Sequence, residues 1–188
     1  MNIRPECKDQ VNTYLFGSPI EAEFYRVVMK YINPSACIKN QYPAKVRGYQ
    51  FAIDFMITVG SHKIGIECDG RQFHSVEKDE WRDKLILGAG IVDSMVRLRG
   101  TDINFRLPDA LYVMAVWYPG LFSGRGVDNI EKLTTSTAKR TDIYMLGAHF
   151  KYRTDIAMIG DDEEIDDPID DEFSEGFGDL FITRRLPE

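Results

Sequence analysis

The stretch from Phe51 to His74 constrains the fold more than any other part of the chain. It contains two apolar runs, Phe51–Val59 and Lys63–Glu67, separated by the short break Gly60-Ser61-His62. Two β-rich runs divided by a glycine-containing break of this length are typical of a β-hairpin. We therefore expect two neighbouring strands, and we expect the rest of the chain to be organised around them.

Acidic residues lie within this predicted hairpin. Asp54 lies inside the first run, and Glu67 and Asp69 lie at the end of the second. His74 follows Asp69 by five residues. Side chains alternate along a strand, so Glu67 and Asp69 share one face while Cys68 points to the other. A buried carboxylate is costly unless it is paired, and converging carboxylates are the oxygen ligands of hard cations. The pattern therefore predicts a divalent-metal site, although a single acid at a strand end would also fit an ordinary turn.

These residues form the pattern D-x(12)-E-x-D-G-x(3)-H, which resembles the PD-(D/E)XK nuclease superfamily. The closer resemblance is to the branch related to the very-short-patch-repair endonucleases, which includes the EDxHD homing endonucleases. It spans residues 16 to 104 and includes Ser18-Pro19-Ile20-Glu21, Gln41, Asp79-x-x-Arg82 and Val96-Arg97-Leu98-Arg99. Two features depart from the family pattern. Asp69 stands where the superfamily has the lysine of its E-x-K motif, and the Cys/His zinc cluster of the repair enzymes is absent.

The resemblance implies an α/β, restriction-endonuclease-like fold, in which a mixed β-sheet is flanked by helices. It also implies a Mg²⁺- or Mn²⁺-dependent endonuclease that hydrolyses phosphodiester bonds of DNA. The preference for DNA over RNA rests on the resemblance alone. The candidate catalytic residues are Glu21, Asp54, Glu67, Asp69 and His74.

Most of these candidates have a defined role in such chemistry. A divalent cation neutralises charge on the phosphate and lowers the pKa of a bound water. Asp54 and Glu67 would hold that cation, together with the backbone carbonyl of Cys68. Asp69 would be a further ligand or would hold the attacking water. His74 would be the general base, because an unperturbed imidazole titrates near neutral pH.

The segment from Ser18 to Tyr31 predicts an amphipathic helix. Ser18 as N-cap, with Pro19 and Glu21 in the first turn, forms a capping box. Apolar residues then recur at helical spacing, namely Ile20, Phe24, Val27, Val28 and Tyr31. Glu21 thus has a complete role as a capping residue. The resemblance implies a second role beside the metal, and both interpretations stay open.

The remaining core is predicted to alternate strands and helices. We expect strands at residues 36–42 and 91–98, and helices at 75–85 and 109–118. A helix between the hairpin and the next strand is a βαβ crossover, so the sheet should be mixed.

Two polar positions of this core allow alternatives. Gln41 is interpreted as a surface amide, although the resembled family has a glutamine beside the site. Asp79 and Arg82 lie three residues apart, so they either form an exposed helix pair or, as the resemblance implies, face the site or the sheet.

Basic residues provide candidate phosphate contacts. The segment Lys45–Gly48 is expected to be a basic loop, and residues 150–153 alternate aromatic and basic side chains. Such alternation suits a nucleic-acid stacking platform or an amphipathic edge strand. The candidate nucleic-acid-binding residues are Lys45, Arg47, Arg71, Arg82, Lys151 and Arg153.

The chain divides into three parts by composition. Residues 1–120 form the predicted nuclease core, and residues 121–160 form a linker, at 121–140, and a C-terminal β extension. Residues 161–188 form an acidic, disordered tail. The tail holds 11 acidic residues within 161–179, whereas residues 1–160 hold 21 Lys and Arg against 18 Asp and Glu. The mildly basic body permits nucleic-acid binding.

Composition places the chain among globular proteins. It has 188 residues, of which 44% are hydrophobic and 12% aromatic, enough for one domain with a core. No apolar run is long enough to span a membrane, and no secretory signal is visible. Three widely spaced cysteines suit a reducing compartment. We therefore expect a cytoplasmic protein of a bacterial cell or phage-infected host.

Two other classes of function remain open. The chain could be a catalytically inactive, nuclease-fold module that binds nucleic acid. It could instead be an interaction protein whose acidic tail mimics DNA and occupies a partner. DNA is the expected partner, with a homodimer or a protein partner of the tail as further candidates.

Overall fold

The structure is a computed structural model that describes residues 16–70, 76–143 and 152–153. In chain order its elements are α1 (Pro19–Val28), β1 (Cys37–Val46), β2 (Tyr49–Val59), β3 (His62–Asp69), α2 (Val76–Gly88), β4 (Ser94–Arg99), α3 (Gly100–Phe105), α4 (Leu107–Trp117), α5 (Gly124–Leu133), α6 (Ser136–Arg140) and β5 (Tyr152–Arg153). The chain is an α/β protein, as predicted.

The sheet has the strand order β1-β2-β3-β4-β5, in which β5 contributes only two residues. β1, β2 and β3 are antiparallel neighbours, whereas β3 and β4 run parallel and are connected through α2. The predicted hairpin is confirmed, because Val59 pairs with His62 across a turn in which Gly60 has a φ of 58°. Glycine suits this turn because other residues rarely adopt a positive φ. The predicted mixed sheet flanked by helices is also confirmed.

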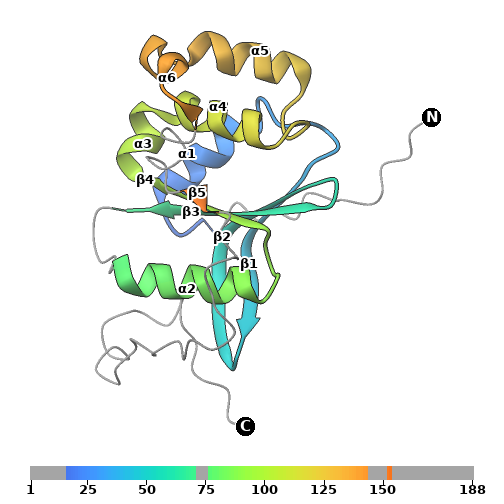
Figure 1. Ribbon diagram of the computed structural model, residues 1–188, viewed down its shortest axis with the longest axis vertical. Coiled ribbons are helices and arrows are strands. Elements are labelled where there is room, and N and C mark those ends of the chain that lie inside the picture. Colours follow the sequence, from blue (N-terminus) through green and yellow to red (C-terminus); the bar gives the residue numbers. More distant parts are fainter. Residues whose placement is uncertain (1–15, 71–75, 144–151, 154–188) are drawn as a thin grey trace, which may run out of the picture.

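Helices cover both faces of the sheet (Figure 1). α1, α3 and α4 lie on one face with α5 and α6 beyond them, and α2 lies on the other face. The core accordingly has two parts. The first contains Phe24, Phe55 and Leu111, and the second contains Ile53 and Trp81. None of the described helices is long and apolar enough to cross a bilayer.

β1 and β2 extend past the rest of the sheet as a two-stranded arm, which comprises residues 42–53. β2 pairs with β3 only over 55–59, whereas it pairs with β1 from Tyr49 to Thr58, except at Asp54. One face of the arm packs on α2. Tyr49 and Phe51 contact Trp81 edge to face, with ring centroids 5.1 and 6.2 Å apart. These aromatic contacts hold the arm against the helix.

The tip of the arm carries the basic residues expected in a loop. Lys45 belongs to β1, and Arg47 lies in the turn; both side chains are exposed. Val46 pairs with Tyr49 across this turn, and Arg47 and Gly48 have φ values of 47° and 86°. Two central residues with positive φ define a tight hairpin turn. The predicted loop is therefore the end of a strand and a two-residue turn.

α1 begins as the sequence predicted. The Ser18 hydroxyl accepts the N–H of Glu21 at 3.4 Å, and Pro19 occupies the first turn. Phe24 and Val28 are fully buried against the sheet. The predicted helix and its buried stripe are confirmed, although the helix ends at Val28, before Tyr31.

Residues 121–140, which we expected to be a linker, instead contain α5 and α6. Ser123 and Thr135 cap these helices, and each side chain accepts a main-chain N–H from the first turn. Ile130 is buried, and the Thr135 N–H donates to Asp109 of α4 at 2.8 Å. The expectation was wrong because Ser, Thr and Gly, which suggested a loop, are also the residues that cap helices.

Close packing at the start of α5 makes a testable prediction. A Cβ added at Gly126 would fall against the backbone carbonyl oxygen of Tyr31, whereas one added at Gly124 would meet nothing within 4 Å. Gly126→Ala should therefore lower the free energy of unfolding by about 1–3 kcal/mol. Gly124→Ala, the matched control in the same helix, should leave it unchanged or raise it by up to about 1 kcal/mol. Equal urea-unfolding midpoints for the two variants would contradict this packing.

Other expectations fall partly or wholly outside the described residues. A second hairpin was expected between residues 143 and 159. Its described parts are Ile143 and β5, and β5 pairs antiparallel with β4. The acidic tail at 161–188 lies outside the described residues. The expectation of reduced cysteines needs a correction: Cys68 is a free thiol, whereas Cys37 is disulfide-bonded. Sequence spacing alone does not reveal which cysteines meet in space.

Candidate active site

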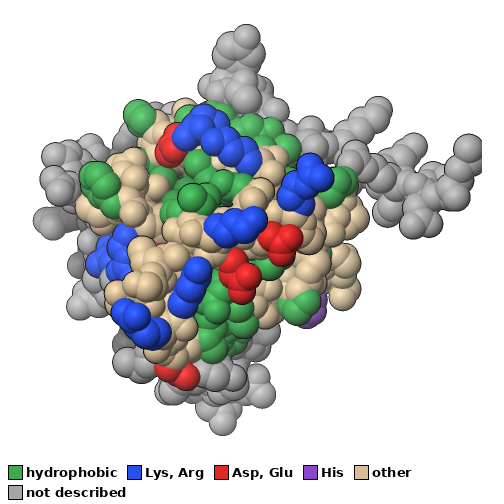
Figure 2. Space-filling view, turned by 90° about the horizontal axis from the view of Figure 1, so that it is seen from above, with side chains coloured by type: hydrophobic (Ala, Val, Ile, Leu, Met, Phe, Trp, Pro, Cys, Tyr) green, Lys and Arg blue, Asp and Glu red, His purple; other side chains and the backbone are tan. Residues whose placement is uncertain are grey.

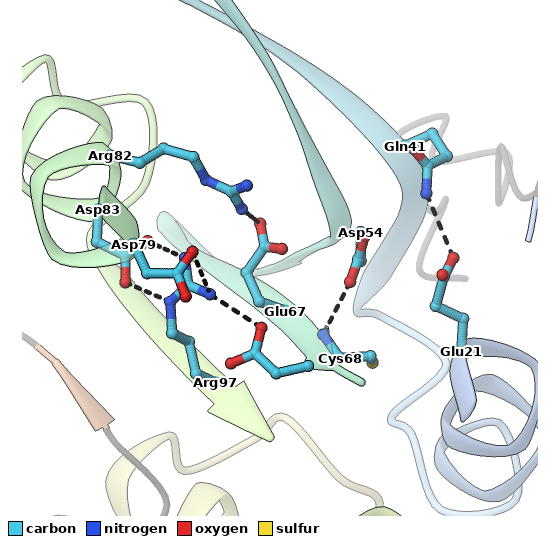
Figure 3. A network of polar contacts seen from close by, with 10 residues as sticks. Glu21, Gln41, Asp54, Glu67, Cys68, Asp79, Arg82, Asp83 and Arg97 are labelled. Atoms are coloured by element: carbon cyan, nitrogen blue, oxygen red, sulfur yellow. Dashed lines mark hydrogen bonds and ion pairs between the residues drawn. The ribbon is translucent and has the colours of Figure 1, made fainter. Parts of the chain in front are cut away.

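The candidate site lies where β2 and β3 diverge. Their backbone pairing begins at Phe55 and Ile66 and continues only toward the hairpin turn. One residue before Phe55, the Asp54 carboxylate Oδ2 accepts the N–H of Cys68 at 2.8 Å (Figure 3). The Asp54 carboxylate thus accepts the Cys68 N–H in place of a backbone carbonyl of β2. This substitution lets the strands separate and brings acidic side chains of both strands to the point of separation.

β1, the other neighbour of β2, is also irregular opposite Asp54. Gln41 of β1 lies between two residues that pair with β2 on either side of Asp54. Gln41 has a φ of 47°, which is uncommon for a residue other than glycine. Its Nε2 donates to Glu21 Oε2 at 3.3 Å. The interpretation of Gln41 as a surface amide is therefore wrong, because its side chain is half-buried and connects β1 to α1.

Glu21 has more contacts than a helix cap requires. Its carboxylate accepts the N–H of Gly17 at 3.0 Å and the hydroxyl of Ser18 at 2.9 Å, which are the capping contacts. It also accepts the amide of Gln41. Glu21 is buried, and its charge helps to raise the pKa of Asp54. The capping role is confirmed, and the position of Glu21 leaves a second role open.

Two buried carboxylates dominate the electrostatics of the site. Burial raises the pKa of Asp54 well above its usual value. The charge of Glu67 raises it further, while the Cys68 N–H and Arg82 act against this rise. Burial likewise raises the pKa of Glu67, against the opposing charges of Arg82 and Arg97. Ionisation of both carboxylates at once is therefore unfavourable, because burial and the repulsion between the two acids outweigh the opposing arginines.

Arg82 of α2 supplies part of that compensation. Its Nη2 forms an ion pair with Glu67 Oε1 (Figure 3). The predicted alternative of an exposed pair with Asp79 is not realised, because Arg82 faces the sheet and only 16% of its side chain is exposed. This agrees with the orientation that the resemblance implied.

Arg97 of β4 organises a second group of acids. Its Nε and Nη2 donate to Asp83 at 2.7 and 2.9 Å, and its Nη1 donates to Asp69 at 2.9 Å and lies 3.5 Å from Asp79. The bidentate contact with Asp83 is the strong geometry for an arginine–carboxylate pair. Arg97 thus fixes the carboxylate of Asp69, which lies on the same face of β3 as Glu67 because side chains alternate along a strand.

Sequence reasoning missed Asp83. Two signals were present: Asp79 and Asp83 are four residues apart, so they share one helix face, and Arg97 lies inside an otherwise apolar strand. A buried arginine requires an acidic partner. Together these features predict a helix face turned toward the sheet.

The structure leaves some predicted site residues untested. His74, Arg71 and Lys151 lie outside the described residues, and Arg153 belongs to β5, although its side chain is not described. The thiol of Cys68 packs in the apolar core, away from Glu67, as predicted from strand alternation. Lys45 and Arg47 lie at the tip of the arm, about 17 Å along β2 from Asp54 at the rise of an extended strand.

The chemistry of the donors suits a divalent cation, although a complete ligand set is not visible. Asp54 and Glu67 supply hard oxygen atoms of the kind that Mg²⁺ and Mn²⁺ prefer. Among the residues that the structure describes, Cys68 is the one hydrogen-bond donor to Asp54. Within the same residues no group of three or more His, Cys, Asp and Glu side chains is arranged to hold a metal.

Comparison with known proteins found no matching family model, no matching curated protein and no matching solved structure. The nuclease resemblance therefore stays an expectation that rests on the sequence motif. The geometry described above is independent of that resemblance.

Proposed function

We propose that this protein is a Mg²⁺- or Mn²⁺-dependent DNA endonuclease with a restriction-endonuclease-like fold. The observation that carries the proposal is the pair of buried carboxylates, Asp54 and Glu67, at the divergence of β2 and β3. Arg82 compensates Glu67, whereas no described residue forms an ion pair with Asp54, and an uncompensated buried acid costs stability. A purely structural role for the pair gives no reason for that cost at Asp54.

The chain's own residues would divide the work of phosphodiester hydrolysis. Asp54 and Glu67, with the backbone carbonyl of Cys68, would hold the cation. When bound, the cation would lower the pKa of a water molecule and neutralise charge on the phosphate. Asp69, oriented by Arg97, would position a water molecule or serve as a further ligand. His74 would accept the proton of the attacking water.

The arm supplies a candidate contact surface for DNA. One face of it packs on α2, while Lys45 and Arg47 are exposed at its tip. A two-stranded β-ribbon is narrow enough to enter the major groove. The surface over α5 and α6 is a weaker candidate, because its Lys and Arg side chains are separated by other residues and have acidic neighbours (Figure 2).

Charge reversal at the arm tests this surface. The double variant Lys45→Glu/Arg47→Glu should weaken binding of a short DNA duplex about tenfold or more at low salt. The slope of log K against log salt should become shallower by about 0.9 for each phosphate that the protein no longer neutralises. The matched control is Lys132→Glu/Lys139→Glu, which makes the same charge change at exposed positions of α5 and α6. Equal reductions in affinity for both double variants would mean that the arm does not bind DNA specifically.

A specific observation favours the second candidate function, a catalytically inactive DNA-binding module. Arg82 already neutralises Glu67, and such a pair can serve structure alone. Incubating supercoiled plasmid with the purified protein, once in Mg²⁺ and once in a chelator, distinguishes the two functions. Nicking that requires Mg²⁺ supports the endonuclease, whereas Mg²⁺-independent binding without nicking supports the module. Binding to a basic protein but not to DNA would support the acidic-tail mimic instead.

A further inference from the structure

Arg97 and the partly buried Arg82 differ in how their donors are used. Arg97 is saturated by three acids, Asp83, Asp69 and Asp79. Arg82 has its one ion pair with Glu67, and its buried Nε and Nη2 atoms have no hydrogen-bond partner of good geometry in the described part of the chain (Figure 3). Buried donors without acceptors are costly. Arg97 therefore has the contacts of a structural anchor, and Arg82 does not.

The partner atom in this pair is unsatisfied as well. Glu67 Oε1 is buried and has no well-directed hydrogen bond, although it lies against Arg82 Nη2. The contact is thus mainly a charge–charge attraction at low local dielectric. A cation held by Glu67 and Asp54 would need the same carboxylate and would repel the guanidinium. The metal and Arg82 therefore compete for Glu67.

We propose that Arg82 is an exchangeable countercation of this site: it neutralises Glu67 in the metal-free protein, and it transfers to a phosphate oxygen when a divalent cation takes Glu67. The inference rests on the proposed function, because it assumes that the Asp54–Glu67 site binds a metal. A guanidinium suits both positions, since its planar fork pairs equally with a carboxylate and a phosphate. The unsatisfied Nε and Nη2 donors are then explained as donors for the substrate.

Metal affinity, measured without any cleavage, tests the competition. Mn²⁺ binding to the full chain is measured by titration calorimetry for wild type, Arg82→Met and Lys84→Met. Lys84 is the matched control, because it is an exposed cation two residues further along α2. Arg82→Met should bind Mn²⁺ about tenfold more tightly than wild type, and Lys84→Met should match wild type. Unchanged or weaker binding in Arg82→Met would overturn the exchange.

A measurement on the wild-type chain covers the case in which Arg82→Met does not fold. The Nε–H resonance of Arg82 in ¹⁵N spectra should shift on addition of Mg²⁺ and again on addition of inorganic phosphate, while that of Arg97 stays in place. An Arg82 signal that ignores saturating Mg²⁺ would overturn the exchange.

The Mn²⁺-binding measurements also distinguish an error in the exchange from an error in the proposed metal site. If wild type binds Mn²⁺, Asp54→Asn does not, and Arg82→Met binds no tighter than wild type, the metal site stands and the exchange is wrong. If Asp54→Asn binds Mn²⁺ as wild type does, or neither protein binds it, the proposed metal site is wrong and the exchange falls with it.

Discussion

Replacing Asp54 by asparagine should abolish Mg²⁺-dependent cleavage and stabilise the metal-free protein. The asparagine side-chain oxygen can still accept the Cys68 N–H, so the local geometry is kept. Loss of one preorganised hydrogen-bond donor to a transition state costs about 10²–10³-fold in rate, and loss of a metal ligand should cost at least that much. Cleavage of a duplex under single-turnover conditions measures this effect.

The stabilisation follows from the raised pKa of Asp54. Burial and the neighbouring acids raise the pKa in the folded state above that in the unfolded state. The folded state therefore binds the proton more tightly, and stability falls as pH rises through the folded-state pKa. Asparagine does not ionise, so the Asp54→Asn variant does not lose stability in this way as pH rises. The melting temperature at neutral pH, without metal, should rise by about 2 °C or more, which corresponds to about 1 kcal/mol for a chain of this size.

Asp128→Asn is the matched control, because Asp128 is an exposed carboxylate on α5. Its cleavage rate and melting temperature should stay at wild-type values. Wild-type cleavage by Asp54→Asn would remove Asp54 from the site. A lower melting temperature of metal-free Asp54→Asn would mean that the charged carboxylate stabilises the fold, which is the opposite of the effect expected from its burial.

Replacing Asp83 by alanine should lower the free energy of unfolding by about 3–5 kcal/mol, the usual effect of removing one partner of a buried ion pair. Asp83 is 1% exposed, and it holds Arg97 through two hydrogen bonds. Its loss leaves the guanidinium with Asp69 and Asp79, which are less buried than Asp83. Urea unfolding followed by circular dichroism gives the free energy.

The neighbouring exposed position provides the control for this experiment. Lys84→Ala changes the same helix and should alter the free energy of unfolding by less than about 0.5 kcal/mol. The double variant Asp83→Leu/Arg97→Met should be closer to wild type than Asp83→Ala, because no buried guanidinium is left without its bidentate partner, and the acids that also lose Arg97, Asp69 and Asp79, are partly exposed. If Asp83→Ala unfolds within about 1 kcal/mol of wild type, the network does not anchor α2 on the sheet.

The sequence predicted the parts of the site that depend on local pattern. Alternation placed Glu67 and Asp69 on one face of β3, and the glycine break placed Asp54 on the neighbouring strand. The helix that begins at Ser18 followed from its capping residues. Each of these inferences uses residues close together in the chain.

Long-range features could not be predicted in the same way. The pairing of Glu67 with Arg82, and of Arg97 with Asp83, depends on how α2 lies across the sheet after the crossover. The left-handed backbone of Gln41 and the arm depend on where β3 stops pairing with β2. No local pattern encodes these positions. The exposed pair of Asp79 with Arg82 and the surface amide of Gln41 were therefore reasonable predictions from sequence, although neither is present in the structure.

Anomalous diffraction from crystals soaked in Mn²⁺ tests most directly whether Asp54 and Glu67 hold a divalent cation where β2 and β3 diverge. We predict an anomalous peak at ligand distance from both carboxylates, with the Arg82 guanidinium moved away from Glu67, and no such peak in Asp54→Asn crystals. A crystal soaked at a Mn²⁺ concentration that supports cleavage, but with no peak at these carboxylates, would contradict the metal site and with it the proposed endonuclease mechanism.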